Sequence, residues 1–284
     1  MRILVTGGSG YIGKAFIKRY RKQFDIVAPT HEQMDLTDAR SIEKQFKTAR
    51  FDAVLHLAGL EERGKRAPLE ADNLIMFKNI QYMAIAHGVK KLITVGEGAE
   101  FDRSKPIVDC TEDMFGRYIP TDGYGLGRYL ISLLASKDKI TTVLRIFGVY
   151  GAGGGTNRPI NRIVAAGARG KKQIVIDRDK TVSAVHIDDA TRVIAEFIRG
   201  DHAKGDYNLV SGDKMSYLAI AKTVKRLVRR DGGDIEIVVK NPEPDNEYSA
   251  SNEKLLSVMP TRFVSMQTGI KKLYEELKKP TKGI

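Results

Sequence analysis

The chain has 284 residues but a single cysteine, Cys110, and no tryptophan. One cysteine cannot form an intramolecular disulfide, which is typical of a reducing compartment, so we expect a cytoplasmic protein. No run of apolar residues approaches the roughly eighteen that cross a bilayer, which excludes a membrane-spanning helix. No charged and apolar leader with a small-residue cleavage site opens the sequence, and we expect neither an export signal nor a membrane partner.

Acidic residues are the scarcer charge: 35 Asp and Glu stand against 47 Lys and Arg, for a formal net charge of +12. One interpretation is a nucleic-acid or anionic-membrane partner, and the other is that the cations lie on solvated helix faces. The densest basic stretch, Lys222 to Arg230, favours the second, because its apolar residues share one side of a helix and no aromatic stacking motif accompanies it. We therefore expect no nucleic-acid partner, and a basic surface that attracts an acidic small molecule.

Glycines, by contrast, are concentrated at the start of the chain, in MRILVTGGSGYIG. A short apolar strand, Ile3–Val5, leads into a turn with Gly7, Gly10 and Gly13, and a helical pattern follows over Tyr11–Gln23. Gly7 permits a tight turn, Gly10 lets the backbone approach a pyrophosphate, and Gly13 lets the helix pack closely against the strand. The helix N-terminus then presents unpaired N–H groups to the anion. The alternative is a glycine-rich turn without a ligand.

Short apolar strand patterns alternate with amphipathic helix patterns through the first half of the chain. The strand patterns cover Ile3–Val5, Asp25–Ala28, Ala53–Leu57, Leu92–Val95 and Thr142–Phe147. The helix patterns cover Tyr11–Gln23, Ser41–Lys47, Leu69–His87 and Tyr124–Ser136. This alternation predicts the α/β class, with a doubly wound parallel sheet covered by helices on both faces and ligands at the carboxyl ends of its strands. After Phe147, the glycine-rich GVYGAGGGTNRP is predicted to be a loop, and a mixed region of helices and strands follows.

The second strand pattern ends near Thr30 and His31, where NAD-binding enzymes usually carry an acidic residue that holds a ribose hydroxyl. No carboxylate stands at this position, and a hydroxyl and an imidazole could hydrogen-bond a 2′-phosphate, which favours NADP. The alternative is that Thr30 caps the following turn and either cofactor fits. Further on, Asp35 could accept a hydrogen bond from the adenine amino group while Leu36 covers the ring. The two residues that follow could equally cap the next helix.

The third strand pattern runs into His56, Leu57, Ala58 and Gly59. The small residues Ala58 and Gly59 let the backbone pass close to the nicotinamide side of a dinucleotide. We assign no proton-transfer role to His56, because a histidine at the end of an apolar run is more often a hydrogen-bonded packing residue.

A second chemical signal is the segment PTDGYGLGR at Pro120–Arg128. Thr121 or Asp122 can cap a helix whose first turn holds Tyr124, and Tyr124 and Arg128 then share a helix face. A cation beside a phenol stabilises the phenolate and lowers its pKa from about 10. Tyr124 is therefore a candidate general acid and base.

Together these motifs resemble the extended short-chain dehydrogenase/reductases of the NAD-dependent epimerase/dehydratase group. The resemblance covers nearly the full length of the chain. It rests on TGGSGYIG at Thr6–Gly13, DLTD at Asp35–Asp38, HLAG at His56–Gly59, Asn73, GVKKLI at Gly88–Ile93, YGLGR at Tyr124–Arg128, RIFGVYG at Arg145–Gly151, VHIDDATRVI at Val185–Ile194 and YNLVSG at Tyr207–Gly212. It implies a Rossmann domain over residues 1–155 and a smaller substrate domain over residues 156–284, with residues 182–205 returning to the first.

The chain departs from the catalytic set of this family, which is Tyr-x-x-x-Lys plus a Ser or Thr at the end of the preceding strand. Tyr124 matches the tyrosine, but Arg128 stands at the lysine position, and Glu97 and Gly98 stand where a hydroxyl is expected. Arg128 keeps the positive charge but is bulkier than an ammonium. Glu97 could hydrogen-bond a substrate hydroxyl or pair with Arg128, and if ionised near Tyr124 it would raise the pKa of the tyrosine.

A second departure precedes VHIDD, where many relatives carry an arginine that grips the substrate diphosphate. This chain has Val182 and Ser183 there, and Arg162, Arg178 or Lys180 could take over the role.

The resemblance and the residue patterns together assign the site. We expect catalysis from Tyr124, Arg128 and Glu97, and substrate contacts from Glu97, Gly98, Asn157, Arg162 and Arg178. We expect the cofactor to contact Gly7, Gly10, Tyr11, Ile12, Gly13, Thr30, His31, Asp35, Leu36, Leu57, Ala58, Gly59, Asn73, Val95, Tyr124 and Arg128. No metal site is assigned.

Two functions fit these residues. The first is an NAD- or NADP-dependent epimerase, dehydratase or reductase that acts on a nucleotide-activated sugar, with Tyr124 as acid and base. The second is a protein that binds a dinucleotide or a sugar nucleotide but has lost catalysis, which the replacements at Arg128, Glu97 and Gly98 favour. The resemblance also implies a homodimer that forms through the helices predicted at Leu69–His87 and Tyr124–Ser136.

Overall fold

The computed structural model describes residues 1–60, 69–243 and 245–279. Its centre is a six-stranded sheet in which every hydrogen-bonded pair of neighbours runs parallel. Across the sheet the strands are, in order, β11 (Gly205–Asn208), β6 (Thr141–Arg145), β4 (Lys91–Gly96), β3 (Ala53–His56), β1 (Arg2–Thr6) and β2 (Asp25–Val27). The predicted α/β fold with a parallel sheet is confirmed. The strand order reverses between β1 and β3, which is where such sheets bind ligands.

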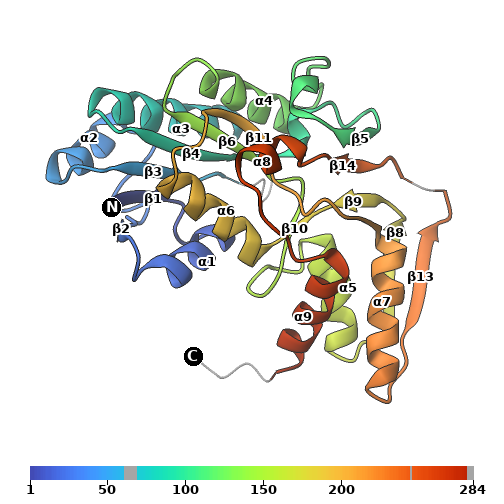
Figure 1. Ribbon diagram of the computed structural model, residues 1–284. Coiled ribbons are helices and arrows are strands. Elements are labelled where there is room, and N and C mark those ends of the chain that lie inside the picture. Colours follow the sequence, from blue (N-terminus) through green and yellow to red (C-terminus); the bar gives the residue numbers. More distant parts are fainter. Residues whose placement is uncertain (61–68, 244, 280–284) are drawn as a thin grey trace.

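Helices cover both faces of this sheet (Figure 1). One face carries α1 (Tyr11–Tyr20) and α6 (Ile187–Arg199), and the other carries α2 (Ala39–Thr48), α3 (Leu69–Ala86) and α4 (Gly123–Ala135). Along β1, Ile3 and Val5 belong to the core that α1 and α6 cover, whereas Leu4 belongs to the core on the other face. Because both faces are buried, the strands are unbroken apolar runs in the sequence.

Short polar side chains fix where these helices begin. Asp38 caps α2 by accepting a hydrogen bond from the backbone N–H of Arg40 at 2.9 Å, and Asp122 caps α4 by accepting one from Gly125 at 2.9 Å. Each cap satisfies a helix N–H group that has no partner within the helix. The sequence left these caps open between two neighbouring residues, and the structure selects the aspartate in both cases.

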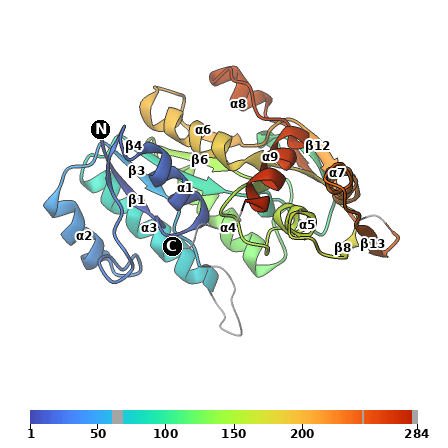
Figure 2. The ribbon, with the colours of Figure 1, turned by 90° about the horizontal axis from the view of Figure 1, so that it is seen from below.

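A second group of elements, here called the C-terminal lobe, has its own core. It consists of α5 (Pro159–Ala168), α7 (Tyr217–Arg230), α9 (Met266–Lys278) and the parallel pair β8 (Gln173–Arg178) and β13 (Glu236–Asn241). Val164, Ile220, Val224 and Ile270 are fully buried at its centre. Seen from below, α7, β8 and β13 lie at the opposite end of the molecule from α2 (Figure 2).

The sequence missed the short elements that depend on distant partners. A four-stranded sheet has the order β12 (Lys214–Ser216), β9 (Thr181–Ser183), β14 (Tyr248–Ala250) and β5 (Ile107–Cys110). Helix α8 covers Glu253–Val258, and two 3₁₀ turns cover Gly98–Glu100 and Glu112–Met114. The loop prediction for GVYGAGGGTNRP is wrong at β7 (Val149–Tyr150), which pairs with β10 (Val185–His186). A two-residue strand has no periodicity of its own, so only its partner defines it.

Pairing between strands far apart in sequence bears on the domain division. β5 pairs with β14 across the predicted boundary at residue 155, while α6 and β11 lie in the large sheet layer. The division into two domains therefore stays a prediction, with residues exchanged in both directions.

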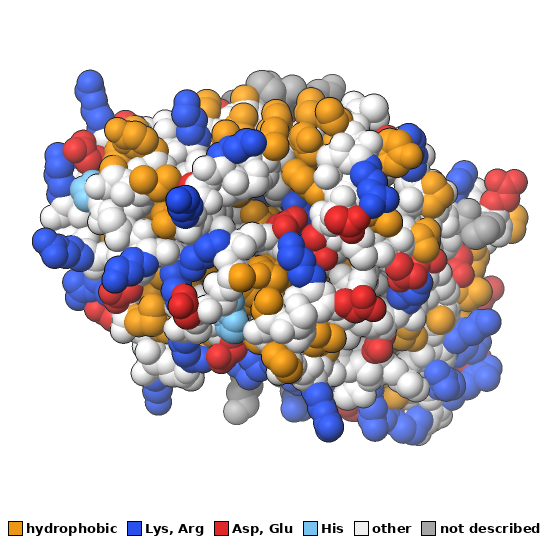
Figure 3. Space-filling view, turned by 45° about the horizontal axis from the view of Figure 1, so that its top comes forward, with side chains coloured by type: hydrophobic (Ala, Val, Ile, Leu, Met, Phe, Trp, Pro, Cys, Tyr) orange, Lys and Arg blue, Asp and Glu red, His pale blue; other side chains and the backbone are white. Residues whose placement is uncertain are grey.

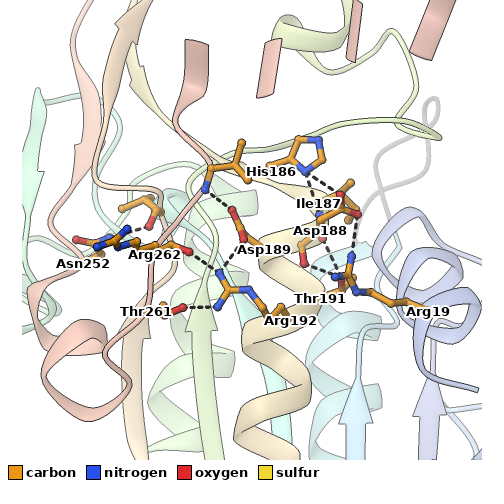
Figure 4. Close-up of polar contacts among 12 residues, drawn as sticks. Arg19, His186, Ile187, Asp188, Asp189, Thr191, Arg192, Asn252, Thr261 and Arg262 are labelled. Atoms are coloured by element: carbon orange, nitrogen blue, oxygen red, sulfur yellow. Dashed lines mark hydrogen bonds and ion pairs between the residues drawn. The ribbon is translucent and has the colours of Figure 1, made fainter. Parts of the chain in front are cut away.

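Helix α6 is fastened at its start to two other parts of the chain (Figure 4). Asp188 forms an ion pair with Arg19 of α1 at 3.2 Å. Arg192 donates hydrogen bonds to Asp189 at 2.7 Å and to the carbonyl oxygen of Arg262 at 2.9 Å. The N-cap residue is His186, whose ring accepts a hydrogen bond from the backbone N–H of Asp188. Asp188 and Asp189 therefore lie in the first turn, where their negative charge interacts favourably with the helix dipole. These contacts join the segment VHIDDATRVI to α1 and to the chain that leads into α9.

Among the described residues, no helix is both long enough and apolar enough to cross a bilayer.

Candidate active site

The glycine turn after β1 is built so tightly that two of its positions exclude a side chain. Gly7 has φ +69°, and a Cβ there would lie 2.5 Å from the backbone of Leu57 and Ala58. A Cβ at Gly13 would lie 2.3 Å from the carbonyl oxygen of Gly7. Gly13 therefore allows α1 to approach the turn itself, and not the strand as the sequence suggested. The turn is pressed against the end of β3, with the N-terminus of α1 at its rim.

Two adjoining clefts run along the carboxyl ends of the strands at this point. The inner cleft has a volume of about 310 Å³ and the outer cleft about 600 Å³. Both are lined by Gly7, Gly10, Leu57, Ala58 and Gly59. The shared wall makes them one groove that crosses the reversal in strand order.

Most of the residues predicted to hold the cofactor line this groove. The outer cleft adds Thr30, His31 and Leu36. The inner cleft adds Tyr11, Ile12, Gly13, Asn73, Val95, Tyr124 and Arg128, and it is also lined by Glu97, which was predicted for catalysis and substrate contact. The sequence therefore predicted residues that the fold brings together from the ends of four strands and from α1, α3 and α4.

The end of β2 differs from the expectation in two respects. Asp35 is not among the residues that line either cleft. Its Oδ1 accepts hydrogen bonds from the backbone N–H and the hydroxyl of Thr37 at 2.8 and 2.7 Å, and the contact of Asp35 with adenine stays a prediction. These bonds hold the pKa of Asp35 below its usual range. A carboxylate that the sequence overlooked, Glu32, does line the outer cleft, and a hydrogen bond from Thr30 lowers the pKa of Glu32.

Tyr124, Glu97 and Arg128 meet in the inner cleft. The hydroxyl of Tyr124 donates a hydrogen bond to Oε1 of Glu97. Nε of Arg128 lies 3.1 Å from the same oxygen, and the guanidinium carbon lies 5.4 Å from the centre of the Tyr124 ring. Only 16% of the Arg128 side chain and 28% of the Glu97 side chain are exposed, so solvent screens these charges weakly. Of the two alternatives for Glu97, the pairing with Arg128 is present, and the contact with a substrate hydroxyl stays a prediction.

The pKa of Tyr124 moves in the direction opposite to the one first expected. Burial raises the pKa, the Glu97 carboxylate raises it further, and the Arg128 cation lowers it only in part. The sequence placed the cation next to the phenol but could not show the depth of burial. Tyr124 is therefore a neutral phenol at physiological pH, which suits a proton donor.

Two polar residues of the inner cleft have structural roles. Nδ1 of His56 lies 2.8 Å from the hydroxyl of Thr6, and burial lowers the pKa of His56 to about 4, so the ring is neutral. Asn73 binds both backbone groups of Leu60, accepting from the N–H at 2.7 Å and donating to the carbonyl at 3.1 Å. The packing role given to His56 agrees with this geometry, and Asn73 fixes the chain that leaves β3.

A buried ion pair that the sequence analysis did not find lies beneath Glu97. Oε1 of Glu100 accepts a hydrogen bond from the backbone N–H of Glu97 at 2.8 Å, and Oε2 lies 2.6 Å from Nε of Arg145. Arg145 also binds Asp206, and neither Glu100 nor Arg145 is exposed by more than 1%. The sequence signal that could have indicated this ion pair is an arginine at the end of an apolar strand, in TTVLR. The ion pair fixes the backbone that carries Glu97.

The residues predicted to contact the substrate lie farther apart than those predicted to hold the cofactor, and most of them do not line the inner cleft. Gly98 packs against β14, since a Cβ there would lie 2.4 Å from the hydroxyl of Tyr248. Asn157, Arg162 and Arg178 do not line the inner cleft, whereas Arg158, which the sequence analysis passed over, does. Substrate contacts at these positions stay predictions.

Comparison with known proteins identifies the family. The family model described as the NAD dependent epimerase/dehydratase family matches residues 3–209. The chain belongs to this family. The match covers the glycine turn, the strands that carry the groove, and the Tyr124–Arg128 segment. It ends with β11, so most of the C-terminal lobe lies beyond it.

Individual members of the family show how broad the likeness is. The chain is 26% identical over 197 residues to GDP-6-deoxy-D-talose 4-dehydrogenase of Aggregatibacter actinomycetemcomitans, which covers 66% of this chain and 64% of that protein. A solved GDP-mannoheptose C4 reductase of Campylobacter jejuni with NADP bound is 18% identical, with a TM-score of 0.81 over 98% of both chains. UDP-glucose 4-epimerase of Thermus thermophilus in complex with NAD is also 18% identical, with a TM-score of 0.80 over 98% of this chain and 99% of that one.

The curated relatives and the solved structures support different conclusions. The chain spans less than two thirds of the length of the curated relatives that it matches. The solved structures share the fold over nearly the whole chain, including the C-terminal lobe, at an identity that speaks for the fold alone.

Proposed function

We propose that this protein is an NAD- or NADP-dependent enzyme that oxidises or reduces a nucleotide-activated sugar, as an epimerase, dehydratase or reductase. The observation that carries the proposal is the single groove in which the glycine turn and the Tyr124–Glu97–Arg128 group face each other. Family membership supports it, as do the activities of the relatives, which are a sugar-nucleotide dehydrogenase, reductase and epimerase.

The groove fits a nicotinamide dinucleotide. Gly7 and Gly13 leave a cradle that a Cβ would fill, and the N-terminus of α1 beside it favours a pyrophosphate. The outer cleft would take the adenosine half, and the inner cleft the nicotinamide half. When bound, the nicotinamide ring supplies or accepts the hydride.

A preference for NADP stays a prediction, and the residues at the end of β2 include one that opposes it. Thr30 and His31 could hydrogen-bond a 2′-phosphate, as the sequence suggested. Glu32 in the same wall would repel that phosphate and could instead accept a hydrogen bond from a 2′-hydroxyl. Titration of the protein with NAD and NADP compares the two effects directly.

Tyr124 and Glu97 form the proton path of the proposed reaction. In the reducing direction the carbonyl carbon of the substrate accepts the hydride while the Tyr124 hydroxyl gives its proton to the carbonyl oxygen. Tyr124 regains a proton from protonated Glu97, which leaves an alcohol and the Glu97 carboxylate. In the oxidising direction the substrate hydroxyl gives its proton to the Tyr124 oxygen, while Tyr124 passes its own proton to Oε1 of Glu97. The hydrogen bond between Tyr124 and Glu97 already joins the two atoms of this second step.

Arg128 holds Glu97 in place in this scheme. Its guanidinium lies against the backbone at Gly59, where a Cβ would be 3.1 Å from a terminal nitrogen, and its Nε faces Glu97. The cation therefore stabilises the Glu97 carboxylate. In a relative with Ser or Thr at this position there is no carboxylate to stabilise, so the lysine of the family pattern does not have this role.

The test is an absorbance assay at the reduced-nicotinamide band, with NAD and NADP and a panel of nucleotide sugars and their 4-keto forms. The expected result is saturable dinucleotide binding and turnover with at least one member of the panel. The second candidate, a binding protein without catalysis, is favoured by the Glu97 carboxylate that occupies the Tyr124 hydroxyl. Tight dinucleotide binding without turnover of any substrate would support that candidate, and absence of binding would contradict both.

We also propose a homodimer formed through α3 and α4. Apolar side chains are exposed on these two helices at Ile75 (43%), Tyr82 (66%), Ile85 (51%) and Leu126 (37%). In Figure 3, hydrophobic side chains gather near the top of the view, on the side of the molecule where Figure 1 places α3 and α4. Ile75, Tyr82 and Ile85 recur at helical spacing on one face of α3, as an interface helix requires.

Replacement of Ile85 by Lys is expected to dissociate this dimer, because the charge would have to be buried without a partner. Light scattering during gel filtration should give about twice 31.6 kDa for the unaltered protein and about 31.6 kDa for the variant. Val108→Lys, which changes an exposed apolar residue of β5, is the control and should leave the mass unchanged. A monomeric unaltered protein would contradict the proposal.

A further inference from the structure

Arg158 is a cation at the wall of the inner cleft. It occupies the N-cap position of α5 in the C-terminal lobe, without a capping hydrogen bond from its side chain, and follows the glycine-rich loop that leaves β7. Its guanidinium carbon lies 5.0 Å from the centre of the Tyr11 ring, which is within the range of a cation–π contact. Tyr11 is the first residue of α1, directly after Gly10 of the phosphate turn. The C-terminal lobe thus brings a positive charge to the turn from the opposite side.

This cation has no acceptor in the part of the chain that the structure describes. Its Nε is buried without a hydrogen-bond partner, and no described carboxylate forms an ion pair with it. Other described arginines near this cleft are paired: Arg128 with Glu97, Arg103 with Asp122, and Arg145 with Glu100 and Asp206. A partly buried guanidinium without an acceptor is unfavourable unless a ligand supplies one.

We propose that Arg158 binds the pyrophosphate of the dinucleotide, opposite the N–H groups of the glycine turn. This rests on the proposed function, and it adds a contact from the C-terminal lobe to a site otherwise built from the sheet layer. A guanidinium can give two parallel hydrogen bonds to a phosphate, and the Tyr11 ring limits where it can lie. Binding of the dinucleotide would then hold α5 against α1 and close the groove from above the turn.

The position of Arg158 favours the cofactor over the substrate as the source of the phosphate. Arg158 contacts Tyr11, and the cleft that it lines is walled on that side by Gly7, Gly10 and Gly13. Of the residues expected to contact the substrate, Glu97 lines this cleft just after β4. Asn157 and Arg162, which are near Arg158 in the sequence, do not line it.

The test compares Arg158→Gln with Arg169→Gln, a control that removes an exposed arginine from the other end of α5. Affinities for NAD and NADP are measured by calorimetry, together with those of UDP-glucose and GDP-mannose for cofactor-loaded protein. Arg158→Gln should weaken dinucleotide binding by roughly tenfold to a hundredfold, the range for a hydrogen bond to a charged group. The affinity for the sugar nucleotides should change less than about threefold, and Arg169→Gln should leave the affinity for both kinds of ligand unchanged. Arg158→Lys keeps the charge but not the two parallel N–H donors, so its dinucleotide affinity should lie between those of the unaltered protein and Arg158→Gln.

The possible outcomes separate this inference from the proposed function. If the unaltered protein binds dinucleotides and Arg158→Gln binds them equally well, the inference is wrong and the proposed function stands. Loss confined to the sugar nucleotides would also overturn it, because it would place Arg158 on the substrate diphosphate. If the unaltered protein binds no dinucleotide, both fail. A circular-dichroism spectrum and melting curve matching those of Arg169→Gln confirm that a weakened variant is folded.

Discussion

Replacing Tyr124 with Phe is expected to lower turnover by roughly a hundredfold to ten-thousandfold, the range for loss of a general acid or base. The change removes one oxygen from the inner cleft and leaves the ring beside the guanidinium groups of Arg128 and Arg103. The affinity for the dinucleotide should change less than about threefold, because no phosphate contact is lost. The measurement is the turnover number and KM of the substrate found in the panel, with the dinucleotide affinity determined separately.

Tyr129→Phe is the matched control, since Tyr129 lies on the same helix and stacks on Phe115 at 4.7 Å, outside the groove. Its activity should equal that of the unaltered protein. A Tyr124→Phe variant that keeps more than about half the turnover would remove Tyr124 from the proton path and leave Glu97 as the candidate acid or base.

The pH profile provides a further readout of the same group. Burial and the Glu97 carboxylate raise the pKa of Tyr124 above its ordinary value near 10, so the phenol keeps its proton below that pH. In the reducing direction the rate should therefore not fall through loss of this proton between about pH 7 and 9. A decline over that range that disappears in Tyr124→Phe would show that the phenol titrates lower than the structure implies.

Replacing Glu100 with Leu is expected to reduce the free energy of unfolding by about 3–5 kcal/mol, the usual cost of removing one partner from a buried ion pair. Arg145 would keep only Asp206, whose side chain is 27% exposed and is shared with Lys254. The double variant Glu100→Leu with Arg145→Met should recover much of this loss, because it leaves no unpaired charge in the core. Urea unfolding of the two single variants and the double variant measures the coupling.

Lys254→Met is the control for this series. It breaks an ion pair with Asp206 in which 44% of the lysine side chain is exposed, and such a pair contributes at most about 1 kcal/mol. A loss below about 1 kcal/mol in Glu100→Leu, or a double variant no more stable than either single one, would contradict the buried-pair account. Glu100→Leu should also reduce turnover, since Glu97 would lose the hydrogen bond that fixes its backbone.

How far the sequence reached depended on the range of the interactions involved. The glycine turn, the helix that carries Tyr124 and Arg128, and the apolar strands are set by neighbours within a few residues, and the structure has each of them where the pattern put it. Strands that exist only by pairing, such as β5 with β14 some 140 residues later, left no periodic signal. Side-chain partners followed the same rule: the sequence did not show that Asp35 accepts hydrogen bonds from Thr37 or that Glu32 lines the groove.

The sequence by itself determined the α/β class, the glycine turn that admits a phosphate, and the tyrosine and cation one helical turn apart, because each depends on local backbone geometry and spacing. Only the tertiary structure decided which charges meet. It set Glu97 against both Tyr124 and Arg128, buried Arg145 between Glu100 and Asp206, and placed Arg158 beside Tyr11 with no acceptor among the described residues. Electrostatic energy depends on distance and burial between residues that are far apart in the chain, and neither quantity can be read from their order along it.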